Sequence, residues 1–411
     1  MTRITTLALL LVAALISSAH AGPQRPNILI FLADDVGFGD LSPYGGPIKV
    51  PAIGRLANEG MRFTDFHVSS ICSPTRAMLL TGRYNQRMAG GALDWALKHL
   101  SNDGLPANEV TIAEMLKGSY PTRAIVGKWH LGRPPQFNPV NNGFTFFYGM
   151  LEADATYTTH VGGSWGRDWW INLAPNPANE YTTFATTREA LRQIDAAGNG
   201  AFFIYVSYQA PHWPIALPGE DESDNRAVRP QVIGLLDKSV GQIMARVRSL
   251  PRPTFVLFLA DNGSGVATDN RPLRGGKGSV YEGGIRVPAI AWWPGRVPHG
   301  ANSETLHVMD VLPTVAELAG VPLPARTLDG QSFARLFAGG RMPARRLFWD
   351  LKGDGAVRDG AWKLVKIGSN APQLYNLASD IRERTNVAAA NPQRVVTLAA
   401  ALEQWRSEVR Q

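Results

Sequence analysis

Polar side chains follow four short apolar runs, each of which we predict to be a strand. The runs and the residues after them are Asn27 to Leu32 before Asp34 and Asp35, Ala124 to Val126 before Lys128 and His130, Phe202 to Ser207 before His212, and Phe255 to Leu259 before Asp261 and Asn262. The carboxyl ends of parallel strands line one crevice of an α/β sheet, where ligands bind. A single polar residue after a strand usually belongs to a turn. Four such ends together predict a binding site.

Four of these residues offer only oxygen atoms as ligands: Asp34, Asp35, Asp261 and Asn262. Oxygen ligands suit hard cations, and no histidine or cysteine cluster in the sequence has the spacing of a zinc site. Three carboxylates in one crevice would repel each other without a cation. The set therefore predicts one bound divalent ion, for which we favour Ca²⁺ over Mg²⁺.

The chain has a single cysteine, Cys72, so it cannot form an intramolecular disulfide. Pro74 follows closely, and an apolar run then leads to Gly82, a pattern that predicts a helix with Cys72 at its N-terminus. Helix N-termini stabilise anions such as sulfate or phosphate, and Arg76, one turn along, could hold the same anion. The alternative is that Cys72 is a small, buried hydrophobic residue.

These residues lie in blocks that resemble the signatures of the type I, formylglycine-dependent sulfatases of the alkaline phosphatase superfamily. The blocks, in the family's order, are Ser70 to Arg76 with Thr81-Gly82, Gly127 to Gly132, Ala210 to Pro214, Asp261 to Gly263, and Leu273 to Gly278 with Glu282-Gly283-Gly284. Similar sequence extends from Arg25 to Leu377. The chain departs from the family's pattern in its short length and at Ser119, which separates Gly118 from Tyr120. Short accessory loops bear on the choice of substrate rather than on the chemistry.

The resemblance implies that Cys72 is oxidised to Cα-formylglycine by a formylglycine-generating or anaerobic sulfatase-maturating enzyme. Residue 72 would then also be a metal ligand. One hydroxyl of the hydrated aldehyde, with its charge held by the cation and Arg76, would attack the ester sulfur and form a covalent sulfo-enzyme intermediate. The second hydroxyl would lose its proton, and inorganic sulfate would leave as the aldehyde re-forms.

The resemblance also implies roles for four further side chains. His130 would be the base of the second step, and Lys128 would contact the diol and a sulfate oxygen. His212 and Lys277 would protonate the leaving alcohol. Taken alone, His130 could be a packed core histidine and Lys277 a solvated loop lysine; within the matched blocks we favour the functional roles.

The segment from Pro134 to Tyr181 is expected to be rich in loops and to border the site rather than to build the core. Its aromatic side chains, including Trp165 and Trp170, could stack on a sugar ring or could pack the loop onto the domain. We predict a sulfated carbohydrate or an aryl sulfate as the substrate. The candidate substrate contacts are Asp154, Tyr157, His160, Trp169 and Arg274.

Two other functions fit part of the pattern. One is a phosphonate monoester hydrolase or phosphodiesterase of the same superfamily, which would use a similar metal and nucleophile. The other is a secreted binding protein that keeps the fold without the chemistry. The second would be expected to lack a metal carboxylate, Arg76 or the cysteine, and all are present.

Composition and the N-terminal sequence limit the partners. The 411 residues carry a net charge of +7, but the basic residues are scattered rather than grouped, so we expect no nucleic-acid binding. Residues 1–21 combine Arg3, the apolar run Leu7 to Ile16 and Ala19-His20-Ala21, which is typical of a signal peptide and too short for a membrane anchor. We therefore expect an exported protein, periplasmic or extracellular.

The remaining pattern predicts an α/β fold with two parts. Residues 22–340 alternate strand-like runs with helical stretches, which predicts a large, mixed, mostly parallel sheet sandwiched by helices, as in alkaline phosphatase. Residues 341–411 contain three short strand-like runs and a polar helix, which predicts a small antiparallel sheet with one helix. Helices are expected at 51–60, 74–81, 111–116, 187–196, 228–249 and 311–318.

Overall fold

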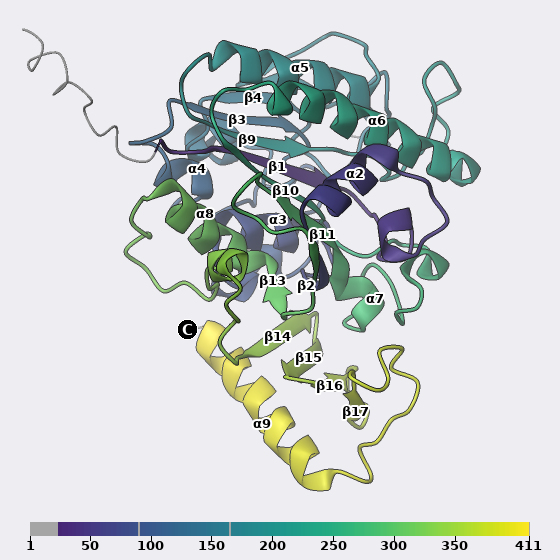
Figure 1. Cartoon of the computed structure of the whole chain (residues 1–411). Helices are drawn as coiled ribbons and strands as arrows, with labels where there is room; N and C mark the ends of the chain where they lie inside the picture. Colours follow the sequence, from purple (N-terminus) through teal and green to yellow (C-terminus); the bar gives the residue numbers. More distant parts are fainter. Residues whose placement is uncertain (1–23, 89–90, 164–165, 411) are drawn as a thin grey trace, which may run out of the picture.

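The computed structural model describes residues 24–88, 91–163 and 166–410 (Figure 1). The predicted signal peptide, residues 1–21, and Trp165 lie outside these ranges. Across the described ranges, no helix has both the length and the apolar character needed to cross a bilayer.

Five adjacent parallel strands form the centre of the large sheet. Each is a short run of aromatic and branched apolar residues, and such runs suit strands that are covered on both faces. In spatial order they are β10 (Thr254–Ala260), β1 (Asn27–Ala33), β9 (Phe202–Ser207), β3 (Thr122–Gly127) and β4 (Phe146–Gly149). All four strands predicted from the sequence are present, and their carboxyl ends lie at one edge.

Antiparallel and short strands complete the sheet on both sides. Next to β10 lies β11 (Arg286–Trp292), which is antiparallel to it, and next to β11 lies β2 (Met61–His67), which is antiparallel to β11. The short strands β12 (Gly300–Asn302) and β13 (Leu306–His307) pair in parallel with β2. Beyond β4 lie β7 (Trp170–Ile171) and β8 (Ala174–Pro175). The predicted fold class, a mixed and mostly parallel sheet, is confirmed.

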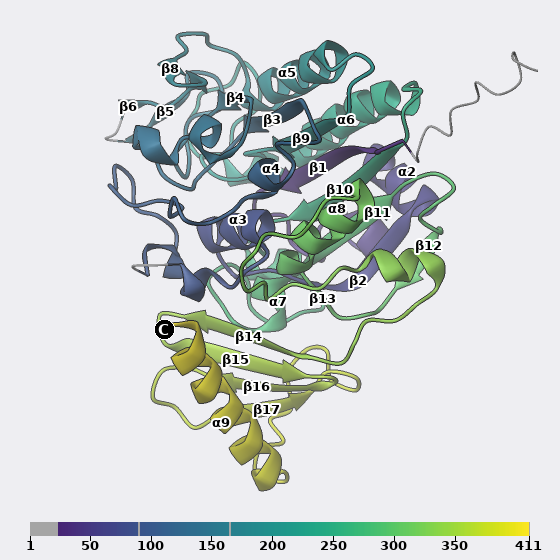
Figure 2. The ribbon, with the colours of Figure 1, turned by 90° about the vertical axis from the view of Figure 1, so that its left-hand side faces the viewer.

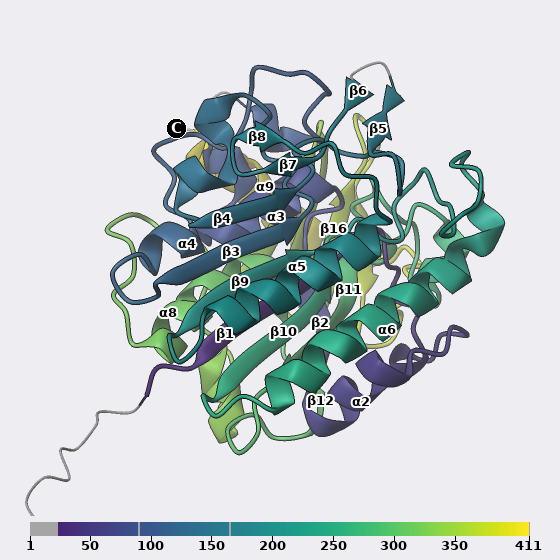
Figure 3. The same ribbon diagram turned by 90° about the horizontal axis from the view of Figure 1, so that it is seen from above.

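Helices cover both faces of this sheet (Figures 1 and 3). One face carries α2 (Pro51–Glu59), α5 (Thr182–Ala196) and α6 (Arg229–Arg248). The other carries α3 (Cys72–Thr81), α4 (Ile112–Met115) and α8 (Val311–Ala319). The six predicted helices are present with shifted ends, because caps and tertiary contacts rather than periodicity set where a helix begins.

The segment 134–181 contributes more to the core than expected. It contains β4, whose Phe147 is fully buried, as well as β7, β8 and the separate hairpin of β5 (Val161–Gly162) and β6 (Gly166–Arg167). The prediction that this segment only borders the site was wrong for β4. A four-residue aromatic run carries too little periodicity to be recognised as a strand.

The C-terminal part is an antiparallel sheet with a helix on its outer face (Figure 2). It consists of β14 (Arg346–Leu351), β15 (Asp354–Asp359), β16 (Trp362–Lys366), β17 (Gln373–Asn376) and α9 (Pro392–Val409). Alternate residues face opposite sides of the sheet. Val357 and Leu364 pack with α9, whereas Trp349 and Val365 join a cluster with Cys72. This sheet and Cys72 therefore share one hydrophobic cluster.

Candidate active site

The ends of β1 and β10 bring the predicted oxygen ligands together. The strands are paired in parallel, with Ala33 opposite Ala260, so the residues that follow are neighbours. The Asp35 amide donates to Asp261 Oδ1 at 3.1 Å, and Asn262 Nδ2 donates to Asp35 Oδ1 at 2.7 Å. All four polar residues of this acidic cluster, Asp34, Asp35, Asp261 and Asn262, are buried.

Two buried oxygens of the acidic cluster have no hydrogen-bond partner among the described residues: Asp34 Oδ1 and Asn262 Oδ1. Such an oxygen costs about 1–3 kcal/mol if nothing satisfies it. Asp34, Asp35 and His212 also present ligand atoms within 4.8 Å of one another. The residues present therefore fit a hard divalent cation held by the acidic cluster.

The charges around the acidic cluster are unequally compensated. Burial and the Asp34 carboxylate raise the pKa of Asp261 to about 7. Burial would also raise the pKa of Asp34, but the positive charges of Lys128 and Arg76 outweigh it and lower that pKa. One carboxyl group thus lacks sufficient positive charge nearby, as expected of a site that accepts a further cation.

Cys72 is the first residue of α3, directly after the extended Ile71. The whole helix is buried, and Cys72 is 2% exposed. Burial raises the pKa of the thiol, although Lys128 and Lys277 act in the opposite direction. An unmodified Cys72 is therefore held as the thiol, which is a weak nucleophile.

Arg76 connects the acidic cluster to the end of β9. Its Nη2 donates to Asp34 Oδ2 at 3.2 Å and to Asp261 Oδ2 at 2.9 Å. Its Nη1 donates to Ser207 Oγ at 2.6 Å and to the Lys128 carbonyl at 3.0 Å. The guanidinium thus binds the carboxylates directly in this structure.

Lys128 and His130 enter the site from the end of β3. Gly127 has φ +104°, and a Cβ there would lie 1.9 Å from the Ser207 carbonyl oxygen, so only glycine allows this turn. Lys128 Nζ lies 2.5 Å from Asp34 Oδ2. His130 has φ +54° and a buried Nδ1 without a partner. Burial, Lys128 and Arg76 lower the pKa of His130, so its neutral ring can accept a proton.

His212 and Lys277 flank Asp35 on the opposite side. Lys277 Nζ lies 2.6 Å from Asp35 Oδ1, and His212 Nε2 lies 3.9 Å from Asp35 Oδ2. Burial would lower the pKa of Lys277, but Asp35 outweighs it and raises that pKa. Burial, with Lys128 and Lys277, lowers the pKa of His212 to about 4. At neutral pH, Lys277 therefore carries a proton that it can donate and His212 is neutral.

A pocket beside Lys277 and Asp35 is also lined by Trp213, Ile215 and Arg226. Trp213 is 45% exposed and stacks on His212, with ring centroids 5.6 Å apart. The sequence analysis did not select Trp213, although it lies within the matched block from Ala210 to Pro214. Its exposure depends on the tertiary structure.

Arg229 is a second residue that the sequence analysis missed. Its Nη2 donates to the Asp35 carbonyl at 2.8 Å, and it pairs with Asp40 at 2.7 Å and Asp269 at 2.9 Å. Asp35 has φ +62°, an unfavourable conformation for aspartate, and Arg229 holds it there. No sequence signal distinguishes Arg229 from other residues at the start of a helix.

The predicted substrate residues are spread over three environments. Tyr157 Oη donates to the His212 carbonyl at 2.9 Å, and Asp154 Oδ2 lies 3.4 Å from His99 Nε2. His160 and Trp169 are buried and stack at 4.1 Å, so these rings pack the segment onto the domain. Packing was the alternative that the sequence left open for the aromatic residues.

Arg274 points away from the acidic cluster. Its Nη1 donates to Tyr375 Oη and to the Glu383 carbonyl, both at 2.9 Å, which ties it to the C-terminal part. Direct contact of Arg274 or the other four residues with a substrate stays a prediction.

Comparisons with known proteins identify the class of this site. A family model described as Sulfatase matches residues 26–321. Human arylsulfatase A is 36% identical over 396 residues, covering 85% of this chain and 76% of the relative. Canine N-acetylgalactosamine-6-sulfatase is 36% identical over 377 residues, covering 83% of this chain and 71% of the relative. The chain therefore belongs to the sulfatase family and is a sulfuric ester hydrolase.

Solved structures show the same fold. Ps i-CgsB in complex with k-i-k-neocarrahexaose is 30% identical, with a TM-score of 0.84 and 94% of both chains covered. A second structure is BT33336S-sulf, from work on the metabolism of multiple glycosaminoglycans by Bacteroides thetaiotaomicron. It is 25% identical to this chain, with a TM-score of 0.78, and the match covers 94% of this chain and 100% of that one.

Proposed function

We propose that this protein hydrolyses sulfate esters of carbohydrates by way of a formylglycine at position 72 and a bound Ca²⁺. The observation that carries the proposal is the pair of buried, unpartnered oxygens, Asp34 Oδ1 and Asn262 Oδ1, in a crevice that Cys72, Lys128 and Lys277 also enter. The proposal accounts both for the buried oxygens of the acidic cluster that lack a partner and for the lysines close to the buried Cys72.

The cation would be held by the acidic cluster and by residue 72. It supplies positive charge for oxygens that become negative during the reaction. Modified to formylglycine, residue 72 supplies a hydrate that can attack sulfur and later release sulfate by re-forming the aldehyde. Burial raises the pKa of the unmodified thiol, which makes it a poor nucleophile, so the proposal assigns the attack to the hydrate instead.

The other side chains bind the anion and move protons. Lys128 and Arg76 lie where they can neutralise sulfate and hydroxyl oxygens, a preorganised positive field that favours the transition state. His130 is the base that removes the proton when sulfate is released. Lys277, with His212, gives a proton to the leaving alcohol as the bond between sulfur and the ester oxygen breaks.

The pocket beside Lys277 supports a sugar as the leaving group. It lies on the side where the alcohol would depart, and the exposed ring of Trp213 offers a face on which a sugar can stack. We also propose export through residues 1–21 and maturation by a formylglycine-generating or anaerobic maturating enzyme, since Cys72 lies in the matched signature block.

Mass spectrometry of the tryptic peptide Phe63 to Arg76, from protein made in its native host, tests the modification. We expect an aldehyde in place of the thiol.

Cys72→Ala should lower kcat on aryl sulfates on the order of 10⁴-fold or more while the protein stays folded. An unmodified thiol in active enzyme, or wild-type turnover by the variant, would contradict the proposal. Matched aryl phosphates serve as the control, and a higher kcat/KM on them would indicate a phosphate-ester hydrolase instead.

A further inference from the structure

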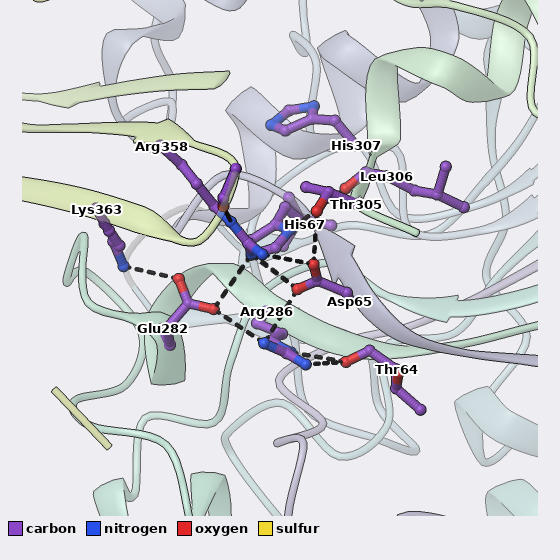
Figure 4. A network of polar contacts seen from close by, with 12 residues as sticks. Thr64, Asp65, His67, Glu282, Arg286, Thr305, Leu306, His307, Arg358 and Lys363 are labelled. Carbon is purple, nitrogen blue, oxygen red and sulfur yellow. Dashed lines mark hydrogen bonds and ion pairs between the residues drawn. The ribbon is translucent and has the colours of Figure 1, made fainter. Parts of the chain in front are cut away.

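A buried network of charged side chains joins the large sheet to the C-terminal sheet (Figure 4). Lys363 on β16 has a fully buried side chain, and its Nζ lies 2.8 Å from Glu282 Oε1 and 2.9 Å from Glu383 Oε1. Glu383 Oε2 in turn accepts a hydrogen bond from the Glu282 amide at 2.7 Å. Lys363 thus holds two glutamates, and one of them begins α7 (Glu282–Ile285).

The start of α7 packs directly on the turn that carries Lys277. The Gly283 amide donates to the Arg274 carbonyl at 2.7 Å. A Cβ on Gly284 would lie 2.0 Å from the Ser279 carbonyl oxygen and 2.5 Å from that of Gly276. No space remains between α7 and the turn, so a displacement of Glu282 must move the backbone around Lys277.

The other end of the same turn is also held by the C-terminal part. Arg274 donates to Tyr375 Oη and to the Glu383 carbonyl, and its guanidinium lies 3.9 Å from the centroid of the Tyr281 ring. Glu383 therefore binds both sides of the Lys277 turn, through its carboxylate at Glu282 and its carbonyl at Arg274.

We propose that Lys363, acting through Glu282 and Glu383, is a positioning residue that keeps Lys277 within reach of the leaving oxygen. The inference rests on the proposed function, in which Lys277 donates that proton. It gives the C-terminal sheet a part in the chemistry although that sheet supplies no residue to the acidic cluster.

The test is Lys363→Met, measured on aryl sulfates whose leaving phenols have increasing pKa. Poor leaving groups depend most on proton donation. We expect kcat/KM to fall about 100-fold for the poorest leaving group, since a displacement of about 1 Å can cost this much. The best leaving group should lose much less. Lys366→Met is the matched control: it lies on the same strand and pairs with Glu403 at 3.2 Å in a partly exposed position, so it should change neither value.

A merely structural role would lower activity equally for every leaving group, and that result would overturn the proposal. If Lys363→Met does not fold, the double variant Lys363→Met/Glu383→Gln, which removes one charge of each sign, should show the same loss of kcat/KM for the poorest leaving group. Lys363→Arg keeps the positive charge and should keep the wild-type dependence of kcat/KM on the leaving group. If the wild type hydrolyses no sulfate ester, the proposed function fails. The positioning is then tested by affinity for inorganic sulfate, which Lys363→Met should weaken and Lys366→Met should not; equal affinities would overturn it.

Discussion

Two buried groups of carboxylates in this protein differ in what neutralises them. In the acidic cluster at the ends of β1 and β10, Asp34 Oδ1 and Asn262 Oδ1 have no partner. Beneath the C-terminal sheet, Asp65 and Glu282 pair with Arg286, Arg358 and Lys363 at 2.7–3.3 Å (Figure 4). Both groups offer ligand atoms close enough for a metal ion.

The difference favours the acidic cluster as the proposed cation site. Burial would raise the pKa of Asp65, but Arg286, His67 and Arg358 outweigh it and lower that pKa to about 2. In the acidic cluster, the pKa of Asp261 is instead raised to about 7. Several arginines surround Asp65, whereas Arg76 is shared between Asp34 and Asp261 and leaves the charge of Asp261 undercompensated, so the acidic cluster has the greater need of a cation. Closeness of acidic residues alone therefore does not define a metal site.

The strongest test of this contrast is Asp261→Asn. We expect kcat/KM on sulfate esters to fall on the order of 10⁴-fold, because the cation that stabilises developing charge is lost. Elemental analysis should find one calcium per chain in the wild type and none in the variant. With chelator present, the free energy of unfolding of the variant should be no lower than that of the wild type, since removing one of three clustered carboxylates relieves their repulsion and Arg76 keeps its pair with Asp34. Retained calcium in the variant would contradict the assignment.

Asp65→Asn tests the other group. Breaking a buried ion pair leaves arginine charges uncompensated, so the free energy of unfolding should fall by about 3–5 kcal/mol in denaturant titrations. Calcium content should not change. Asp359→Asn is the control, because its pair with Arg346 is exposed on both sides and should contribute less than about 1 kcal/mol. If the two variants lost the same free energy of unfolding, the buried ion pairs of Asp65 would contribute no more to stability than the exposed pair of Asp359.

The smallest expected effect is the pH dependence of the Asp65 contribution. Because the folded state lowers the pKa of Asp65 to about 2, its ionised form stabilises the fold above about pH 4, and this stabilisation is lost as the pH falls towards 2. The difference in unfolding free energy between wild type and Asp65→Asn should therefore shrink by about 1 kcal/mol between pH 6 and pH 3. A difference that is constant over this range would show that the pKa of Asp65 is not lowered.

Some features of the fold can be predicted from the sequence because they depend on the local pattern of apolar and polar residues. The runs before Asp34, Lys128, His212 and Asp261 are long enough to show as strands, and parallel strands end at the same edge of a sheet. The sequence therefore predicts that their polar residues lie together. The short β4 escaped because four residues carry too little periodicity to identify a strand. In β2 the alternation of apolar and polar residues lasts only from Met61 to Thr64, since the buried Asp65 is compensated by arginines from other segments.

The sequence by itself determined the helix that begins at Cys72, the strand ends that supply the oxygen ligands and the resemblance to the sulfatases. The tertiary structure decided which charges are matched. Lys363 meets Glu282, and Arg358 meets Asp65, across 81 and 293 positions. Trp169 is buried, whereas Trp213 is exposed beside Lys277. The physical reason is that secondary structure follows from neighbours along the chain, while burial and ion pairing follow from segments that meet only when the chain is folded.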